Sequence, residues 1–361
     1  MTIINTAPAY IVPLSQPKAP PPPKSSFPNH RPLTMHLSTL FLTFLTLSPT
    51  LSQPTSPISV TQLFNFSTST DIENGAIDPV TNTMLITTFT DARLYALDLN
   101  DPYPTANLLT SFYPNATAIT GIAPIGHGKY AITGGVRGSY HYYNETIYTI
   151  DFGAYAANIT ASPVTKAVAH LPQAIMLNGL ASLLRRPTTV LAADSRVGCI
   201  FRIDTLTGTS DIVFQSDALS APANGSSEIG INGLKTHGEY AYYTNTALKT
   251  FGRVKITDDG IAVRGKNGKV EVEVLATLNS GLEEYQWDDF DFDEEGTVYV
   301  AMGGPNGSAI GTIRPDGDVE VLFTKVVRGP TSVHVVEKEG MRKKLYITTN
   351  SGGGQVVKAV L

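Results

Sequence analysis

Short stretches in which apolar and polar residues alternate recur along most of the chain, separated by turns that contain glycine. In one of them, the acidic pair Asp288–Asp289 opens a strand, Glu294–Gly296 forms a turn, and Val298–Ala301 returns as a second strand. Alternation with a period of two on both sides of a glycine-bearing turn predicts a β-hairpin. Helical periodicity is nearly absent, so we expect an all-β protein.

The same hairpin pattern recurs six times, and several copies add a third and a fourth strand, such as Cys199–Asp204 and Ser210–Phe214. Four strands repeated every 45 to 60 residues, roughly, predict a six-bladed β-propeller with four-stranded blades around a central channel. We expect the strand Val60–Phe66 to join the C-terminal strand Gln355–Leu361 and close the circle, because this pairing hides two sheet edges at once.

Polar residues begin the innermost strand of every predicted blade. When the six copies are aligned on the position before the glycine, these residues fall at one level around the channel: Asn74, Thr120, Asn178, Asn232, Asp288 and Thr331. Asn-Gly is also a common turn dipeptide, but here it opens a strand instead of joining two strands. We therefore predict that these six side chains surround one small-molecule pocket. Trp287 is either a wall of this pocket or a core residue between blades.

The N-terminus has the composition of a targeting region. Residues 1–34 are rich in proline and predict a disordered extension, and residues 35–52 form a short apolar run that ends in small residues, as in a secretory signal peptide. We expect Met35 to be the working start and the propeller to occupy residues 53–361. Six Asn-X-Ser/Thr acceptor sites agree with a secreted or luminal glycoprotein, at Asn65, Asn115, Asn144, Asn158, Asn224 and Asn306.

The charge and composition of the chain argue against two classes of partner, nucleic acids and membranes. A net charge of −5 over 361 residues argues against nucleic acid, and the lack of a second long apolar run argues against membrane attachment after signal cleavage. Cys199 is the single cysteine, so no disulfide within the chain is expected, and its apolar neighbours predict burial. We expect the histidines to lie on the surface or in packing positions: His127, His141, His170, His237 and His334. The oligomeric state stays open.

Two motifs resemble those of the gluconolactonase/regucalcin-like (senescence-marker-protein) six-bladed propellers: Asn232-Gly233-Leu234 and the run Asp288–Gly296. The resemblance implies a divalent cation, calcium or zinc, held by one Glu, one Asn and one Asp, and lactone hydrolysis by metal-activated water. Asn232 and Asp288 match two ligands and Asn178 matches a further site asparagine. The resemblance thus implies these three as the reactive groups, with Asn74, Thr120 and Thr331 as binding groups. When Gly75 sets the register, Asn74 fills the third position and Glu73 falls one residue early, on the opposite face. Because carboxylate charge holds such cations, we expect weak metal binding or no cofactor.

The chain is also similar to a secreted fungal branch of this family, the hetero-Diels–Alderases of tropolone sesquiterpenoid pathways. That likeness implies a pericyclase of secondary metabolism that joins a quinone-methide-type heterodiene to an alkene of a terpenoid such as humulene. Such a reaction requires positioning of the two partners and hydrogen bonds to the heterodiene oxygen. Two alternatives stay open: a metal-dependent lactonase of the gluconolactonase type, and a non-enzymatic propeller that binds a small molecule.

Overall fold

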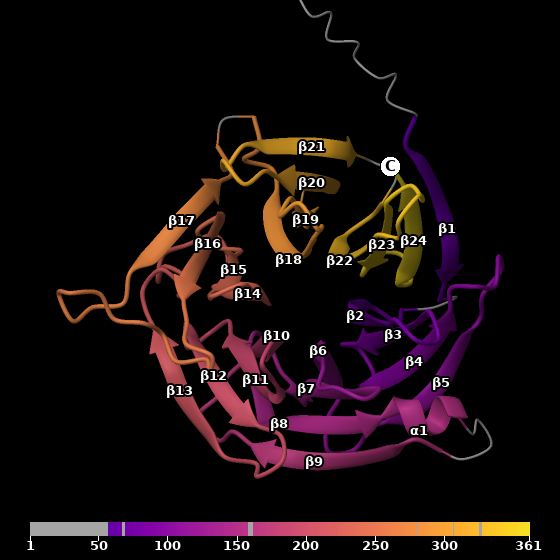
Figure 1. Ribbon diagram of the computed structural model, residues 1–361, viewed down its shortest axis with the longest axis horizontal. Coiled ribbons are helices and arrows are strands. Elements are labelled where there is room, and N and C mark those ends of the chain that lie inside the picture. Colours follow the sequence, from indigo (N-terminus) through magenta and orange to yellow (C-terminus); the bar gives the residue numbers. More distant parts are fainter. Residues whose placement is uncertain (1–56, 67–68, 158–161, 280, 306, 325–326) are drawn as a thin grey trace, which may run out of the picture. The chain divides into compact units, whose positions relative to one another are not determined.

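Six four-stranded antiparallel sheets are arranged radially around one axis in the computed structural model (Figure 1). The structure describes residues 57–66, 69–157, 162–279, 281–305, 307–324 and 327–361. The prediction of an all-β, six-bladed propeller is confirmed. The predicted disordered extension and signal peptide, residues 1–34 and 35–52, lie outside the described residues.

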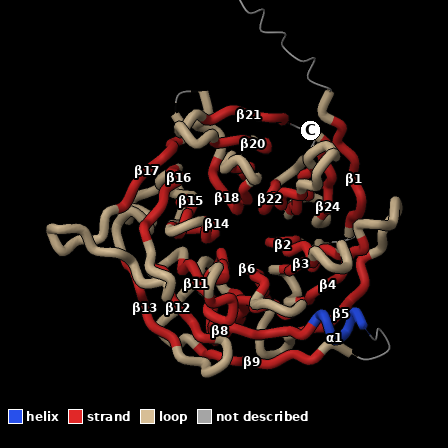
Figure 2. The backbone as a smooth tube through the Cα atoms, viewed as in Figure 1, coloured by secondary structure: helices blue, strands red, loops and turns tan. Residues whose placement is uncertain are grey.

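Five blades are contiguous in sequence: β2 (Ile72–Asp78), β3 (Thr83–Thr88), β4 (Arg93–Asp98) and β5 (Ala106–Ser111); β6 (Ala118–Pro124), β7 (Lys129–Arg137), β8 (Tyr142–Asp151) and β9 (Val164–His170); β10 (Leu177–Leu183), β11 (Arg186–Asp194), β12 (Cys199–Asp204) and β13 (Ser210–Gln215); β14 (Ile231–His237), β15 (Tyr240–Asn245), β16 (Thr250–Lys255) and β17 (Val272–Thr277); β18 (Gln286–Phe292), β19 (Val298–Gly303), β20 (Ala309–Ile313) and β21 (Val319–Thr324). The short helix α1 (Phe152–Ala157) lies at the rim, between β8 and β9 (Figure 2). Among the described residues no helix has the length and apolar character needed to cross a membrane.

The sixth blade combines both ends of the described chain. It contains β22 (Pro330–Val336), β23 (Lys344–Thr349) and β24 (Gln355–Val360), and β1 (Ser59–Asn65) completes it as the outermost strand. β1 pairs antiparallel with β24, with Ser59 opposite Val360. The predicted closure of the circle is therefore confirmed, and two sheet edges are covered by one pairing.

The hydrophobic core lies between neighbouring blades. One cluster joins Ile147 of the second blade to Val190 and Phe201 of the third. Cys199, fully buried in the same cluster, is a small core residue as expected. Because the apolar faces of the sheets are used for blade-to-blade packing, the inner edge of each blade is left to carry polar side chains towards the axis.

Candidate functional site

The inner strands share a β-bulge near their start. In β14 the pair Asn232–Gly233 lies opposite the single residue Thr244, and in β18 the pair Asp288–Asp289 lies opposite Ala301. A bulge sets two residues of one strand against one of its partner. The first residue of each pair marks the same level of the axis in every blade.

The bulge in β2 contains Glu73 and Asn74, which together lie opposite Thr87. Hydrogen bonds identify the equivalent positions: the backbone N–H of Asn74 donates to Thr87 Oγ1 at 3.1 Å, as that of Gly233 does to Thr244 Oγ1 at 2.8 Å. Asn74 therefore corresponds to Gly233, and Glu73 corresponds to Asn232.

The prediction that Asn74 fills the ligand position is therefore wrong. It took Gly75 as the equivalent of the other glycines, because Asn74-Gly75 also reads Asn-Gly, whereas the pairing with β3 places the bulge one residue earlier. The polar ring at this level consists of Glu73, Thr120, Asn178, Asn232, Asp288 and Thr331. We call these six residues the ring.

The two carboxyl groups of the ring influence each other. Burial raises the pKa of Glu73 to about 7, opposed by the Arg137 guanidinium and reinforced by the carboxylates of Asp289 and Asp71. Burial also raises the pKa of Asp288 well above its usual range, with Glu73 and Asp289 adding to the shift. Like charges are thus held close together in a poorly solvated place.

Asn232 leaves an oxygen without a partner at this site. Its Nδ2 donates to Thr246 Oγ1 at 3.0 Å, but its Oδ1 is buried and has no hydrogen-bond partner among the described residues. Glu73, Asn232 and Asp288 together offer two carboxylates and one amide oxygen, the hard donors that calcium prefers. They therefore fit a divalent cation, in agreement with the ligand set that the family resemblance implies. No group of three or more His, Cys, Asp or Glu side chains converges in the part of the chain that the structure describes, so the amide oxygen of Asn232 is needed to complete this set.

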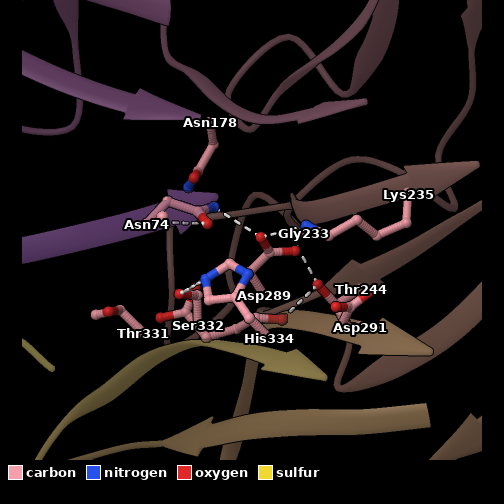
Figure 3. Close-up of polar contacts among 12 residues, drawn as sticks. Asn74, Asn178, Gly233, Lys235, Thr244, Asp289, Asp291, Thr331, Ser332 and His334 are labelled. Atoms are coloured by element: carbon pink, nitrogen blue, oxygen red, sulfur yellow. Dashed lines mark hydrogen bonds and ion pairs between the residues drawn. The ribbon is translucent and has the colours of Figure 1, made fainter. Parts of the chain in front are cut away.

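The remaining ring residues divide into two kinds. Thr120 Oγ1 donates to Leu177 O at 2.9 Å and Thr331 Oγ1 donates to Ile72 O at 3.1 Å, so both threonines join neighbouring blades. Asn178 is only 4% exposed, and no described residue hydrogen-bonds to its side-chain amide. Its amide points towards Asn74 in Figure 3. Asn178 is therefore the ring residue best placed to bind a ligand.

Trp287 does not line a pocket. It is fully buried between blades, where its Nε1 donates to Lys249 O at 2.9 Å. Neighbouring residues of a strand point to opposite faces, so the residue before the ring residue Asp288 turns into the core. Predicted as a possible wall or as core, Trp287 is core.

An apolar cluster instead borders the ring. It contains Ala118, Tyr142 and Met176, with Phe89 and Ile229 packed against it. Its Tyr142 lies close enough to Glu73 for that carboxyl group to raise the pKa of the phenol, behind the larger effect of burial. The sequence signal for this cluster was weak: Ala118, the first residue of β6, and Met176, immediately before β10, each stand two residues before a ring residue.

A second polar layer lies one residue further along the strands. Asn74 Nδ2 donates to Asp289 Oδ2 at 2.6 Å, and Lys235 Nζ lies 2.5 Å from the same oxygen (Figure 3). Asp289 occupies the position that is glycine in β14, and a Cβ on Gly233 would lie 2.6 Å from Asp289 Oδ1. The glycine is therefore required beside this carboxylate. Simple motif reading gave Asp289 and Lys235 no role.

Four acceptor sites for N-glycosylation can be located. Asn65, Asn115, Asn144 and Asn224 are all exposed, as modification requires. Asn158 and Asn306 lie outside the described residues.

Two relatives share most of their length with this chain, whereas no protein-family model matches it. A "Putative hetero-Diels-Alderase" from Phoma sp is 25% identical over 348 residues, which cover 87% of this chain and 95% of the relative. A "Putative hetero-Diels-Alderase asR5" from Sarocladium schorii is 26% identical over 332 residues, covering 81% of this chain and 78% of that protein.

Solved structures confirm the likeness in fold. The calcium-binding protein regucalcin from Agrobacterium tumefaciens superposes with a TM-score of 0.57 at 14% identity, covering 84% of this chain and 93% of that one. A protein described as a putative gluconolactonase gives a TM-score of 0.58 at 12% identity, covering 84% and 92%. The chain is thus a six-bladed propeller with the fold of regucalcin and gluconolactonase, and its sequence resembles those of proteins named as hetero-Diels–Alderases.

Proposed function

We propose that the protein is a hetero-Diels–Alderase-like enzyme of fungal secondary metabolism, with the ring as its active site. The observation that carries this proposal is the similarity to the Phoma relative, which extends over 95% of that protein. The proposed reaction joins a quinone-methide-type heterodiene to the alkene of a terpenoid such as humulene, in the secretory pathway or outside the cell.

The residues of the ring suit the requirements of this reaction. A hetero-Diels–Alder cycloaddition converts the two π bonds of the heterodiene and the π bond of the alkene into one C–C bond, one C–O bond and one new π bond. It neither gains nor loses protons or electrons. It is accelerated by holding the two partners in a reactive orientation and by hydrogen bonds to the oxygen on which charge develops. The Asn178 amide N–H groups, which no described residue binds, would donate to that oxygen.

The apolar partner would pack against the cluster beside the ring. Tyr142 and Met176 are the buried large side chains of that cluster, and Phe89 packs on them. Burial of a hydrocarbon against such a surface stabilises the complex by about 25 cal/mol per Å². The polar ring and the apolar cluster would therefore orient the two ends of the reacting pair.

A second function is favoured by one specific observation, the placement of Glu73 in the ring. Glu73, Asn232 and Asp288 would hold a divalent cation, which when bound supplies a Lewis acid and an acidified water. This set supports a metal-dependent lactonase of the gluconolactonase type. A propeller that binds a small molecule without turning it over is the third possibility.

One set of assays separates the three functions. Purified protein is given either a quinone-methide precursor with humulene or glucono-δ-lactone, before and after treatment with EDTA and after calcium or zinc is restored. Cycloadduct formation by the wild type, reduced at least tenfold in Asn178→Ala and unchanged in Asn107→Ala, supports the first proposal. Asn107 is an exposed asparagine on β5 and serves as the matched control.

Other outcomes support the alternatives. Lactone turnover that EDTA abolishes and the metal restores, without cycloadduct, replaces the first proposal with the second. Binding of the humulene or the lactone without any product indicates a non-enzymatic propeller.

A further inference from the structure

A cavity of about 520 Å³ lies on the axis at the end opposite to the ring. Its lining comes from the second half of all six inner strands, for example Ile122, Leu180, Lys235 and His334, whereas the ring residues stand near the starts of the same strands. The buried contact of Asn74 with Asp289 lies between the two levels. The cavity is therefore separate from the ring, and its volume suits a small organic ligand.

A chain of hydroxyl groups determines the tautomer of His334. Thr331 donates its proton to Ile72 O, so Thr348 donates to Thr331 at 2.8 Å and Ser332 donates to Thr348 at 2.6 Å. Ser332 Oγ therefore accepts at 2.9 Å from His334 Nε2, which carries the hydrogen. Burial lowers the pKa of His334 to about 4, so its imidazole is neutral at pH 7.

The other imidazole nitrogen of His334, Nδ1, is consequently a hydrogen-bond acceptor. Although His334 is only 7% exposed, no described residue donates to its Nδ1, and this atom is not enclosed by protein. Because His334 lines the cavity, a donor group on a ligand would satisfy Nδ1.

Asp291 is a second acceptor on the cavity wall. Its oxygens accept backbone N–H bonds from Val335 and Phe292, each at 2.9 Å, but it takes part in none of the ion pairs of the described residues. The ammonium groups nearby are already engaged, Lys235 with Asp289 and Lys343 with Asp293. Asp291 therefore forms no ion pair among the described residues. Burial raises its pKa to about 6, opposed by the Val335 N–H and by Lys235, so it is mostly ionised at pH 7.

The net charge of the side chains in and beside the cavity also favours a cationic ligand. Five carboxylates line or adjoin the cavity against two ammonium groups: Asp289, Asp291, Asp293, Glu294 and Glu337 against Lys235 and Lys343. Such a cavity repels anions and attracts cations.

The walls would also accommodate an apolar body. His237 and Phe292 stack with centroids 4.8 Å apart and planes 23° from parallel, and both face the cavity with Ile122, Pro124 and Leu180. Aromatic faces additionally attract organic cations.

We propose that this cavity is a second binding site, for a small organic ammonium compound. The ammonium group donates to the Asp291 carboxylate and to His334 Nδ1, and the apolar body packs against the His237–Phe292 stack. This site does not depend on the reaction proposed for the ring.

The test uses phenethylamine as probe, with 2-phenylethanol as its neutral analogue and 3-phenylpropionate as its anionic analogue. In calorimetric titrations of the full protein at pH 7, we expect the amine to bind at least tenfold more tightly than either analogue. Asp291→Asn keeps the acceptor for Val335 but removes the charge, and should weaken amine binding roughly ten- to a hundredfold. Asp316→Asn, in an exposed turn, is the matched control and should change nothing.

Three results would overturn the inference. The first is equal affinity for the amine and the alcohol, and the second is unchanged affinity for the amine in a folded Asp291→Asn variant. The third is that Glu73→Gln loses amine binding while Asp291→Asn keeps it, which would place the amine at the ring. Folding of each variant is checked by circular dichroism, and His334→Phe, which removes Nδ1, gives a second, independent loss.

Discussion

The side-chain amide of Asn74 donates a 2.6 Å hydrogen bond to the carboxylate of Asp289, 215 residues further along the chain. The same carboxylate holds the ammonium group of Lys235. The three residues belong to β2, β18 and β14, so one contact connects three blades across the axis (Figure 3). Asp289 is 2% exposed, and its charge is compensated here by a cation and an amide donor.

Asp289→Asn should therefore destabilise the propeller by about 3 kcal/mol, because Lys235 would keep its charge in a poorly solvated place without a counter-ion. Urea unfolding followed by fluorescence measures the change. Asp258→Asn is the control, since it breaks the exposed ion pair with Arg185 and should cost less than about 1 kcal/mol. Equal losses in the two variants would show that the axial contact is no stronger than a surface ion pair.

Replacement of Glu73 tests the register of β2. Glu73→Gln keeps the size of the side chain but removes the carboxylate charge, so calcium binding should weaken at least tenfold by calorimetry. Asp71→Asn removes a carboxylate two residues away, outside the ring, and should alter binding by less than about threefold. Failure of the wild type to bind calcium would count against the fit of this oxygen set. An equal loss in both variants would count against the register.

Replacements of Met176 and Trp287 should affect different properties, the KM in the first case and the stability in the second. Met176→Ala removes part of the apolar cluster beside the ring and should raise the KM for a terpenoid substrate up to about tenfold, at about 0.8 kcal/mol per lost methylene contact. Trp287→Phe removes the hydrogen bond to Lys249 O and should lower the stability by about 1 to 2 kcal/mol with KM unchanged. Steady-state kinetics and thermal unfolding of the two variants check both parts. A raised KM in Trp287→Phe would return Trp287 to the pocket.

Glu145 predicts a dependence of stability on pH. It is 1% exposed, its Oε1 accepts from the Leu177 N–H at 2.6 Å, and its Oε2 has no partner among the described residues. Burial raises its pKa from 4.5 to about 8, so between these values the unfolded chain loses a proton that the folded chain keeps. This carboxyl group therefore lowers the stability as the pH rises from about 4.5 to about 8, with little further change above.

Glu145→Gln removes that contribution. The variant should match the wild type near pH 4.5 and exceed its melting temperature at pH 8, since each pKa unit corresponds to about 1.4 kcal/mol. Melting curves across this range measure the difference between the two proteins. Glu294→Gln, at an exposed position, is the control. A difference that shrinks as the pH rises would contradict the buried, protonated state.

Local patterns were sufficient for the fold. Alternation with a period of two is a property of each strand alone, and the sixfold recurrence of the hairpin is visible without any contact. The pairing of β1 with β24 also followed, because unpaired outer edges at the two ends of a propeller have one obvious partner. The placement of Asn178, Asn232 and Asp288 at one level also followed from the sequence, because the three residues occupy the same position in the repeated hairpin.

Local patterns did not predict the register of β2 correctly, because the sequence is compatible with two registers between this strand and its neighbour. Asn74-Gly75 reads like Asn232-Gly233, yet the pairing of β2 with β3 puts the bulge at Glu73–Asn74. A shift of one residue exchanges the faces of a strand, and only the contacts with Thr87 and with the next blade decide it. His334 is buried and hydrogen-bonded to Ser332, as expected of a packing residue, but only the fold shows that it also lies on the wall of the axial cavity.

The sequence by itself thus determined the repeated unit, the number of blades and the presence of polar residues near the start of each inner strand, because these depend on spacing within single strands. The tertiary structure decided which carboxylate enters the ring and which buried charges meet on the axis. Those outcomes depend on hydrogen bonds between strands and on contacts between residues as far apart as Asn74 and Asp289.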